Sequence, residues 1–310
     1  MALVPLVFHE DYDLNFGRHV FPTEKYRLIR DALLGSGEAR ESDFHRPEMA
    51  TDDEIRRVHD EDWVRKLRKG TISYHEILQL EVPYSQKMVS GFWLAAGGSI
   101  LAAKLAREHG VAYNVGGGFH HAFPGHGEGF CAIHDVAVAI RALQSEGSIR
   151  KALVMDVDVH QGNGTAAIFA ADDSVFTISI HQFHNYPTVK PPSNLDIDLE
   201  DGVGDTEYLE KLRHAYVPLL ELVRPDMVFY VAGADPYRED QLGGLSLTME
   251  GLYARDRLVM GKALEMGIPV TVALAGGYAR RVEDTVEIHA NTWRAAEESL
   301  SSLRWTPKSA

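Results

Sequence analysis

Asp156, Asp158 and His160 lie at alternate positions in "ALVMDVDVHQGNG", residues 152–164, and their side chains are of the types that bind metal ions. They follow the apolar start of a predicted strand. Because strand side chains alternate between two faces, we expect all three to project from the same face. Two carboxylates and an imidazole are costly to bury unless a cation neutralises them. The spacing therefore predicts a cation site at the end of a buried strand.

Asp235, in "GADPYRED", completes a three-ligand set with Asp158 and His160. A catalytic zinc ion typically has three protein ligands, His and carboxylate among them, and keeps an open position for water or substrate. Asp156 should lie deeper, where it either orients a histidine or holds a monovalent cation together with backbone carbonyls. Taken alone, Asp235 could equally cap a helix. The alternating trio is harder to explain as caps, because a cap needs only one such group.

Two further motifs supply groups for proton transfer and for stabilising an oxyanion. His120 and His121 follow three glycines in "VGGGFHH", and glycine lets the backbone approach a ligand closely. Two imidazoles near a metal suit general acid–base catalysis. Tyr278, in "AGGYA", also follows a strand-like run, and its hydroxyl could donate to an oxyanion. A metal, a proton shuttle and an oxyanion donor are the groups needed to hydrolyse an amide-like carbonyl.

The segments that must position these groups alternate between strand-like and helix-like patterns. The predicted strands are "ALVPLVFH", "GVAYNVGGG", "ALVMDVDVH", "SVFTISIH", "DMVFYVAGAD" and "PVTVALAGGY". Helical patterns occupy 91–110, 130–147, 206–223 and 248–267, and three of them end at a glycine expected to cap the helix: Gly110, Gly147 and Gly267. This alternation predicts an α/β fold with a parallel sheet covered by helices on both faces. Since five strands end in polar or glycine-rich residues, and ligands bind beyond the carboxyl ends of parallel strands, we expect one shared crevice.

Composition narrows the class of protein. The 310 residues are 45% apolar, which is enough to bury a sizeable core in one large α/β domain or two small ones. A net charge of −14 argues against a general nucleic-acid binder, which needs a basic patch. The single cysteine, Cys131, excludes an internal disulfide, and we find neither a signal peptide nor a membrane-spanning run of roughly 20 apolar residues. We expect a soluble cytoplasmic protein that binds neither nucleic acid nor membrane.

With these motifs identified, the chain resembles the zinc-dependent histone deacetylases of the arginase–deacetylase superfamily. The resemblance covers nearly the whole chain and looks closest to the class IV branch, which includes bacterial members. It rests on "GGGFHHAFPGHGEGFC", "DVDVHQGNGT", "SISIHQ", "GADPYREDQLGGLSLT" and "AGGYA". It implies a single domain over residues 1–310, with a central, mostly parallel eight-stranded sheet. The arginase branch is the nearest competitor, but it would need more carboxylates for a second metal ion than these motifs provide.

The resemblance also implies a role for each motif residue. One Zn²⁺ would be held by three ligands: Asp158, His160 and Asp235. His121 would act as general base and then general acid, beside His120 as its electrostatic partner, with Asp156 supporting His120. Tyr278 would polarise the acyl carbonyl and stabilise the tetrahedral oxyanion. Asn163 would pair with His121 where class I members have an aspartate, and since an amide carries no negative charge, we expect a less basic His121.

A substrate tunnel and potassium sites are implied in the same way. The tunnel would be lined by Gly129, Phe130, Tyr186 and Leu242. An inner K⁺ site, formed largely by backbone carbonyls, would comprise Asp156, Asp158, His160, Ser179 and Ile180. A second, outer K⁺ site would comprise Phe169, Asp172 and Val175. Tyr186 replaces the usual phenylalanine and adds a hydroxyl at the rim, while "ISYHEILQLEVPYS" lacks an obvious match to the rim aspartate with which class I enzymes grip the substrate backbone.

Together these observations predict a zinc-dependent amidohydrolase that removes an acetyl or longer acyl group from acylated lysine or a similar amine. The binding partner would be an acylated lysine peptide or a small acylated amine such as a polyamine. The alternative is a non-catalytic module that binds acylated amines. The presence of every metal ligand, both histidines and the tyrosine disfavours it, because a pure binder has no use for an acid–base pair.

Overall fold

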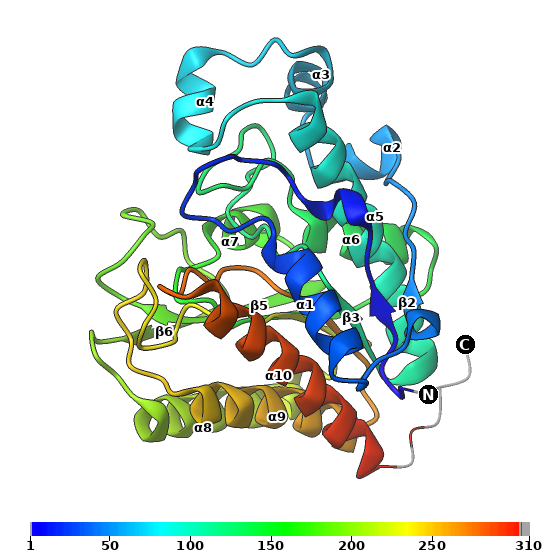
Figure 1. The fold of residues 1–310 in the computed structure, drawn as a ribbon, viewed down its shortest axis with the longest axis vertical. Coiled ribbons are helices and arrows are strands. Elements are labelled where there is room, and N and C mark those ends of the chain that lie inside the picture. Colours follow the sequence, from blue (N-terminus) through cyan, green and yellow to red (C-terminus); the bar gives the residue numbers. More distant parts are fainter. Residues whose placement is uncertain (1, 304, 306–310) are drawn as a thin grey trace.

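All neighbouring strands of the central sheet run parallel to one another. The computed structural model describes residues 2–303 and 305, and in this part of the chain eight strands form one sheet in the order β2-β1-β3-β8-β7-β4-β5-β6 (Figure 1). The strands are β1 (Leu6–Val7), β2 (Phe44–His45), β3 (Val111–Asn114), β4 (Ala152–Asp156), β5 (Val175–Gln182), β6 (Leu195–Leu199), β7 (Met227–Val231) and β8 (Val270–Ala273). The predicted eight-stranded, mostly parallel sheet is confirmed.

The strand patterns located six of these eight strands, and the two that they missed are the edges. The central strands β3, β4, β7 and β8 are buried along their whole length, which explains their near-continuous apolar runs. The edge strand β2 has only two residues, both partly exposed. The opposite edge, β6, reads "LDIDL" and is buried only at its last residue. Neither edge carries the continuous apolar run by which the inner strands are recognised.

Helices cover both faces of the sheet. Within the described residues they are α1 (Lys25–Gly35), α2 (Asp52–Ile55), α3 (Glu61–Lys69), α4 (Tyr74–Leu80), α5 (Gln86–His109), α6 (Asp135–Ser145), α7 (Asn163–Phe169), α8 (Asp205–Val223), α9 (Met249–Glu265) and α10 (Val282–Ser301), with two short 3₁₀ helices, η1 (Glu10–Tyr12) and η2 (Glu41–Asp43). Helices α8, α9, α10 and α1 pack on one another in turn, while α5 packs on α6, β3 and β8. Figure 1 shows α8, α9 and α10 on one side of the sheet, and α5 and α6 on the other.

The predicted helix ends are confirmed, and two predicted helix starts are wrong: the helix predicted over 91–110 begins five residues earlier, at Gln86. Gly110, Gly147 and Gly267 all have positive φ at or just after a helix end, as expected of C-terminal caps. The helix predicted over 130–147 begins only at Asp135, where the His134 side chain caps it by accepting a hydrogen bond from a backbone N–H. Of the apolar residues before it, Phe130 lines a pocket, while Ala132 and Ile133 are buried in the core.

Helix α5 is the apolar core helix of its layer. By length and composition alone it could cross a membrane, a feature that the sequence analysis overlooked. In the fold, 78% of its apolar window is buried, because α6, β3 and β8 cover it. Its hydrophobicity is therefore explained by packing, and the cytoplasmic location stays a prediction.

The order of the strands creates the crevice predicted from their ends. After β3 the chain crosses to β4, and β8 and β7 later fill the space between them. In parallel sheets, such a reversal of strand order opens a crevice beyond the carboxyl ends of the strands. The loops after β3, β8, β7 and β4 therefore meet, although they come from the whole length of the chain.

Candidate active site

Strand β4 ends earlier than predicted, so two of the three metal-binding candidates lie in a loop. The strand stops at Asp156: the N–H of Val157 still donates to the carbonyl of Val231, but the backbone N–H groups after it turn to side chains. The N–H of Asp158 donates to Asp156 Oδ1 over 3.1 Å, and the N–H of His160 donates to Asp158 Oδ1 over 2.9 Å. The prediction that strand alternation brings Asp158 and His160 to the same face was therefore wrong. Their side chains nevertheless converge.

Asp158, His160 and Asp235 form a buried cluster with the geometry of a metal site. Their ligand atoms lie within 4.8 Å of one another. Asp235 caps no helix: its Oδ1 accepts the N–H of Val159, and its buried Oδ2 accepts no hydrogen bond from the described residues. A Cβ at Gly276 would lie 2.0 Å from Asp235 Oδ2 and 2.6 Å from Asp158 Oδ2, so glycine keeps this space open. Donors and space together fit one divalent cation.

The cluster concentrates negative charge. Burial alone would lower the pKa of His160, but the carboxylates of Asp158 and Asp235 raise it to about 10. Burial, and then the neighbouring Asp158 carboxylate, raise the pKa of Asp235 to about 7. Both shifts have the sign expected where carboxylates crowd together and a positive charge is stabilised. The site therefore attracts a cation.

His120 and His121 have different partners and hence different charges. His120 Nδ1 lies 2.6 Å from Asp156 Oδ2; burial opposes its protonation, but Asp156 and then Asp158 raise its pKa to about 9. His121 Nδ1 lies 2.7 Å from Asn163 Oδ1, and burial together with the imidazole of His120 lowers its pKa well below the usual value. Near neutral pH, His120 is thus a cation and His121 is neutral.

The Asn163 amide also selects the tautomer of His121. Asn163 is the first residue of α7, and the backbone N–H of Gly164 donates to its Oδ1 over 3.0 Å. This oxygen is therefore an acceptor, so the proton in the bond to His121 sits on Nδ1 of the imidazole. The other ring nitrogen, Nε2, carries a lone pair that can accept a proton.

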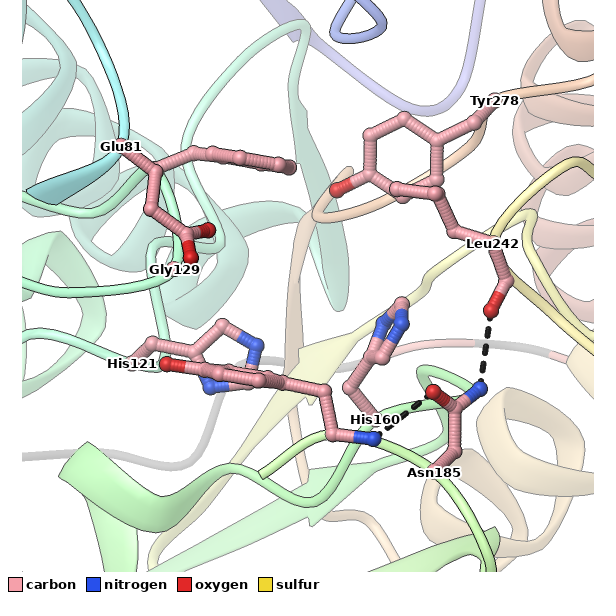
Figure 2. A pocket seen from close by; sticks show the side chains of 9 residues that line it. Glu81, His121, Gly129, His160, Asn185, Leu242 and Tyr278 are labelled. Atoms are coloured by element: carbon pink, nitrogen blue, oxygen red, sulfur yellow. Dashed lines mark hydrogen bonds between the residues drawn. The ribbon is translucent and has the colours of Figure 1, made fainter. Parts of the chain in front are cut away.

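Tyr278 places a hydroxyl opposite the histidines. Its backbone N–H donates to Asp240 Oδ2 over 2.7 Å, and its ring packs edge-on against Phe21. Figure 2 shows its hydroxyl pointing into the space above the rings of His121 and His160. Burial, followed by the carboxylates of the cluster, raises the pKa of Tyr278 well above its usual value. The hydroxyl therefore stays protonated and can donate a hydrogen bond.

A pocket of about 180 Å³ opens above these groups. It contains all four predicted tunnel residues, and its lining comprises Glu81, His121, Gly129, Phe130, His160, Asn185, Tyr186, Leu242 and Tyr278 (Figure 2). The φ of Gly129 is +52°, and a Cβ there would lie 2.8 Å from His121 Cδ2, so glycine is needed beside the His121 imidazole. Tyr186 packs edge-on against the His121 ring, with 4.9 Å between their centroids.

Sequence reasoning missed two lining residues, Glu81 and Asn185. Glu81 comes from the segment in which no rim acid was recognised; it ends α4 with a φ of +61° and reaches the mouth of the pocket. Asn185 Nδ2 donates to the carbonyl of Leu242, and Asn185 Oδ1 accepts the N–H of Tyr186, so it joins two walls (Figure 2). A single polar residue in a loop gives no sequence signal of such a role.

The residues predicted to bind potassium lie behind and beside the cluster. Asp156 and Ser179 are paired across β4 and β5, and Ile180 is buried next to them. The outer set spans the loop between α7 and β5: Phe169, Asp172 and Val175. There, the Asp172 carboxylate lies 2.6 Å from the Arg141 guanidinium. Both potassium sites stay predictions.

The chain resembles known proteins over most of its length. A model of the histone deacetylase domain matches residues 19–293. An uncharacterized protein of Picosynechococcus is 42% identical over 295 residues, covering 95% of this chain and 98% of the relative. Histone deacetylase 2 of Arabidopsis thaliana is 30% identical, covering 93% of this chain and 79% of that protein. Among solved structures, the HDA15 HD domain matches with a TM-score of 0.80 at 26% identity, covering 98% of this chain and 91% of that one.

Proposed function

The chain belongs to the histone deacetylase family, and from this premise we propose that it hydrolyses the acyl–nitrogen bond of an acylated lysine side chain or a similar amine. The observation that carries the proposal is the convergence of three kinds of group on one pocket. These are a buried Asp–His–Asp cluster that fits a divalent cation, a neutral histidine and a tyrosine hydroxyl. Together they match the requirements of metal-assisted amide hydrolysis.

The proposed cofactor is one Zn²⁺ ion, held by Asp158, His160 and Asp235. When bound, zinc supplies a Lewis acid that polarises the acyl carbonyl and lowers the pKa of a water molecule. The Tyr278 hydroxyl points into the same space and donates a hydrogen bond to the carbonyl oxygen as negative charge develops there (Figure 2).

The two histidines have different roles: His121 carries out both proton transfers, and His120 supplies a positive charge. His121 is neutral and exposes Nε2, so it takes the proton from the water that attacks the acyl carbon, and then gives that proton to the amine nitrogen as the C–N bond breaks. His120 pairs with the Asp156 carboxylate, which favours its protonated form, so His121 is the better base. The fixed positive charge of His120 stabilises the anion that forms beside it. The products are a carboxylate and an amine.

The pocket walls determine which substrate side chain and which acyl group can enter. Phe130, Tyr186 and Leu242 present apolar surface suited to an aliphatic chain, and their contact with substrate excludes water from the reacting carbonyl. Behind the reacting centre there is room of only about 10 Å³, beside Phe21 and Ala275. This is about the space of a single water molecule. The geometry therefore supports an acetyl group over a longer acyl chain.

Turnover of an acetyl-lysine peptide by the purified, zinc-loaded protein tests this proposal. We expect release of the free lysine peptide and its abolition by a hydroxamate, which competes for the metal. Peptides carrying octanoyl or myristoyl groups should react at least about tenfold more slowly, because the floor of the pocket is closed. A faster reaction of the longer chains would contradict the proposed acyl preference.

Small acylated diamines are the second candidate substrates. Glu81 lies at the pocket mouth, where its carboxylate can pair with a second amine of the substrate. Assaying an N-acetylated diamine beside the acetyl-lysine peptide distinguishes the two candidate classes of substrate. Higher kcat/KM for the diamine, reduced selectively by Glu81→Gln, would favour a small substrate over a protein lysine.

A further inference from the structure

One carboxylate connects the Asn163 amide with the Tyr186 hydroxyl. Glu128 Oε1 accepts hydrogen bonds from Asn163 Nδ2 over 2.5 Å and from the Tyr186 hydroxyl over 2.9 Å. Its other oxygen, Oε2, lies 3.1 Å from His126 Nε2 and accepts a bond from Gln79 over 3.3 Å. Asn163 and Tyr186 are two positions at which the chain departs from the pattern that it resembles, with an amide in place of the aspartate of class I members and a tyrosine in place of the usual phenylalanine. Both residues are held by the same group.

Glu128 is charged although it is largely covered. Its side chain is only 16% exposed. Burial alone would raise the pKa of Glu128, but the hydrogen bonds from His126, Asn163, Tyr186 and Gln79 hold it below the usual value. A carboxylate with this many donors is fixed in position as well as in charge.

Glu128 does not contact the substrate pocket itself. It lines a neighbouring hollow of about 510 Å³, whereas the lining of the 180 Å³ pocket does not include it. Tyr186 lines both spaces, and Asn163 lines the hollow while its amide oxygen reaches His121. Glu81 also lines both spaces, but Glu128 forms no hydrogen bond with it. The hydrogen bonds of Glu128 therefore reach the pocket through Asn163 and Tyr186.

We propose that Glu128 is a positioning residue for the deacylation: its carboxylate holds the Asn163 amide with the oxygen facing His121, and it anchors the Tyr186 hydroxyl at the pocket wall. An amide can present either its oxygen or its NH₂ group to a neighbour. The negative charge of Glu128 favours the orientation with NH₂ facing Glu128, and this keeps the proton of His121 on Nδ1. Glu128 thereby supplies the negative charge that the Asn163 amide lacks, and it lies one hydrogen bond further from His121 than the amide does. This inference rests on the proposed function.

The test compares four proteins: the wild type, Glu128→Gln, Asn163→Asp and the double variant. Glu128→Gln keeps an acceptor but removes the charge, and we expect kcat to fall about tenfold with little change in KM, since Glu128 touches no substrate. Asn163→Asp places a second carboxylate at the 2.5 Å contact with Glu128, and kcat should fall more, by about 100-fold. In the double variant the new glutamine donates to the new aspartate, so kcat should recover at least about tenfold over Asn163→Asp.

Equal activity of Glu128→Gln and wild type would overturn the proposal, as would effects that simply multiply in the double variant. Glu210→Gln, on the exposed surface of α8, is the matched control and should match the wild type. Thermal unfolding midpoints of the same proteins give a readout without turnover: non-additive changes support the Glu128–Asn163 coupling, and additive changes overturn it. A wild type that turns over no acylated amine would instead contradict the proposed function, and the unfolding data then decide on the coupling alone.

Discussion

Replacing Tyr278 by phenylalanine separates the chemistry of the hydroxyl from the packing of the ring. The ring lies edge-on to Phe21 and Phe130, at centroid distances of 5.9 and 6.1 Å, and the residue is held by its backbone N–H bond to Asp240. Phenylalanine keeps all of these contacts. We therefore expect the free energy of unfolding to change by no more than about 0.5 kcal/mol, and the zinc content to stay the same.

The decrease in kcat of Tyr278→Phe should be large compared with its small effect on stability. The Tyr278 hydroxyl is the only hydrogen-bond donor that we assign to the oxyanion. Removing one preorganised donor of this kind lowers kcat by about 100- to 1000-fold, or roughly 3–4 kcal/mol. KM should change little, because the bond strengthens only as charge develops on the carbonyl oxygen.

Tyr216→Phe provides the matched control. Tyr216 lies on α8, is fully buried, and donates its hydroxyl to the carbonyl of Val259 over 3.2 Å. Losing this bond should cost about 1 kcal/mol of stability and leave kcat unchanged. Steady-state kinetics on an acetyl-lysine peptide and urea unfolding of both variants measure the two effects. Full activity of Tyr278→Phe, or an equal loss of kcat in Tyr216→Phe, would refute the role given to the hydroxyl.

Three further predictions concern the metal cluster. Asp158→Ala should reduce bound zinc from about one ion per chain to none and abolish turnover with it; metal analysis showing full occupancy would exclude Asp158 as a ligand. Gly276→Ala places a Cβ 2.0 Å from Asp235 Oδ2, so zinc affinity should fall at least about tenfold in a titration with a competing chelator, and an unchanged affinity would contradict the open space assigned to this site. In protein stripped of metal, the folded-state pKa of His160 is about 10 against a usual 6.5, so its stabilising effect is complete below about pH 6.5 and is lost as the pH rises towards 10. His120, with a pKa of about 9, adds to the same loss of stability. The melting temperature of the stripped protein should therefore fall by about 5 °C between about pH 7 and pH 10, and zinc should make this fall smaller by removing the contribution of His160; an equal fall with and without zinc would show that His160 is not held by the carboxylates.

Much of the fold could be predicted because the central strands are buried on both faces. Continuous apolar runs identify β3, β4, β7 and β8, and their parallel arrangement brings their carboxyl ends to one edge. This reasoning alone places His121, Asp235 and Tyr278 near one another, although they are far apart in sequence. The edge strands escaped prediction because partly exposed strands need no continuous apolar run.

The parts of the site that could not be predicted depend on loop conformation. Glu81 and Asn185 belong to no quoted motif, and Glu128 lies within "GGGFHHAFPGHGEGFC" at a position to which the motif assigned no role. Their contacts exist only because particular turns fold back on the pocket. One such turn requires a φ of +52° at Gly129 and +71° at Phe130. Positive φ at a non-glycine residue is not readable from local sequence. The side chains proposed to orient the catalytic groups were therefore less predictable than the proposed catalytic groups themselves.

Isotope labelling of the released acid gives the sharpest test of the proposed hydrolysis. The zinc-loaded protein is incubated with an acetyl-lysine peptide in ¹⁸O-enriched water, and both products are analysed by mass spectrometry. If water attacks the acyl carbon, the acetate gains one ¹⁸O atom per turnover and the free lysine peptide gains none. Absence of any release, or release of unlabelled acetate, would contradict the proposed reaction.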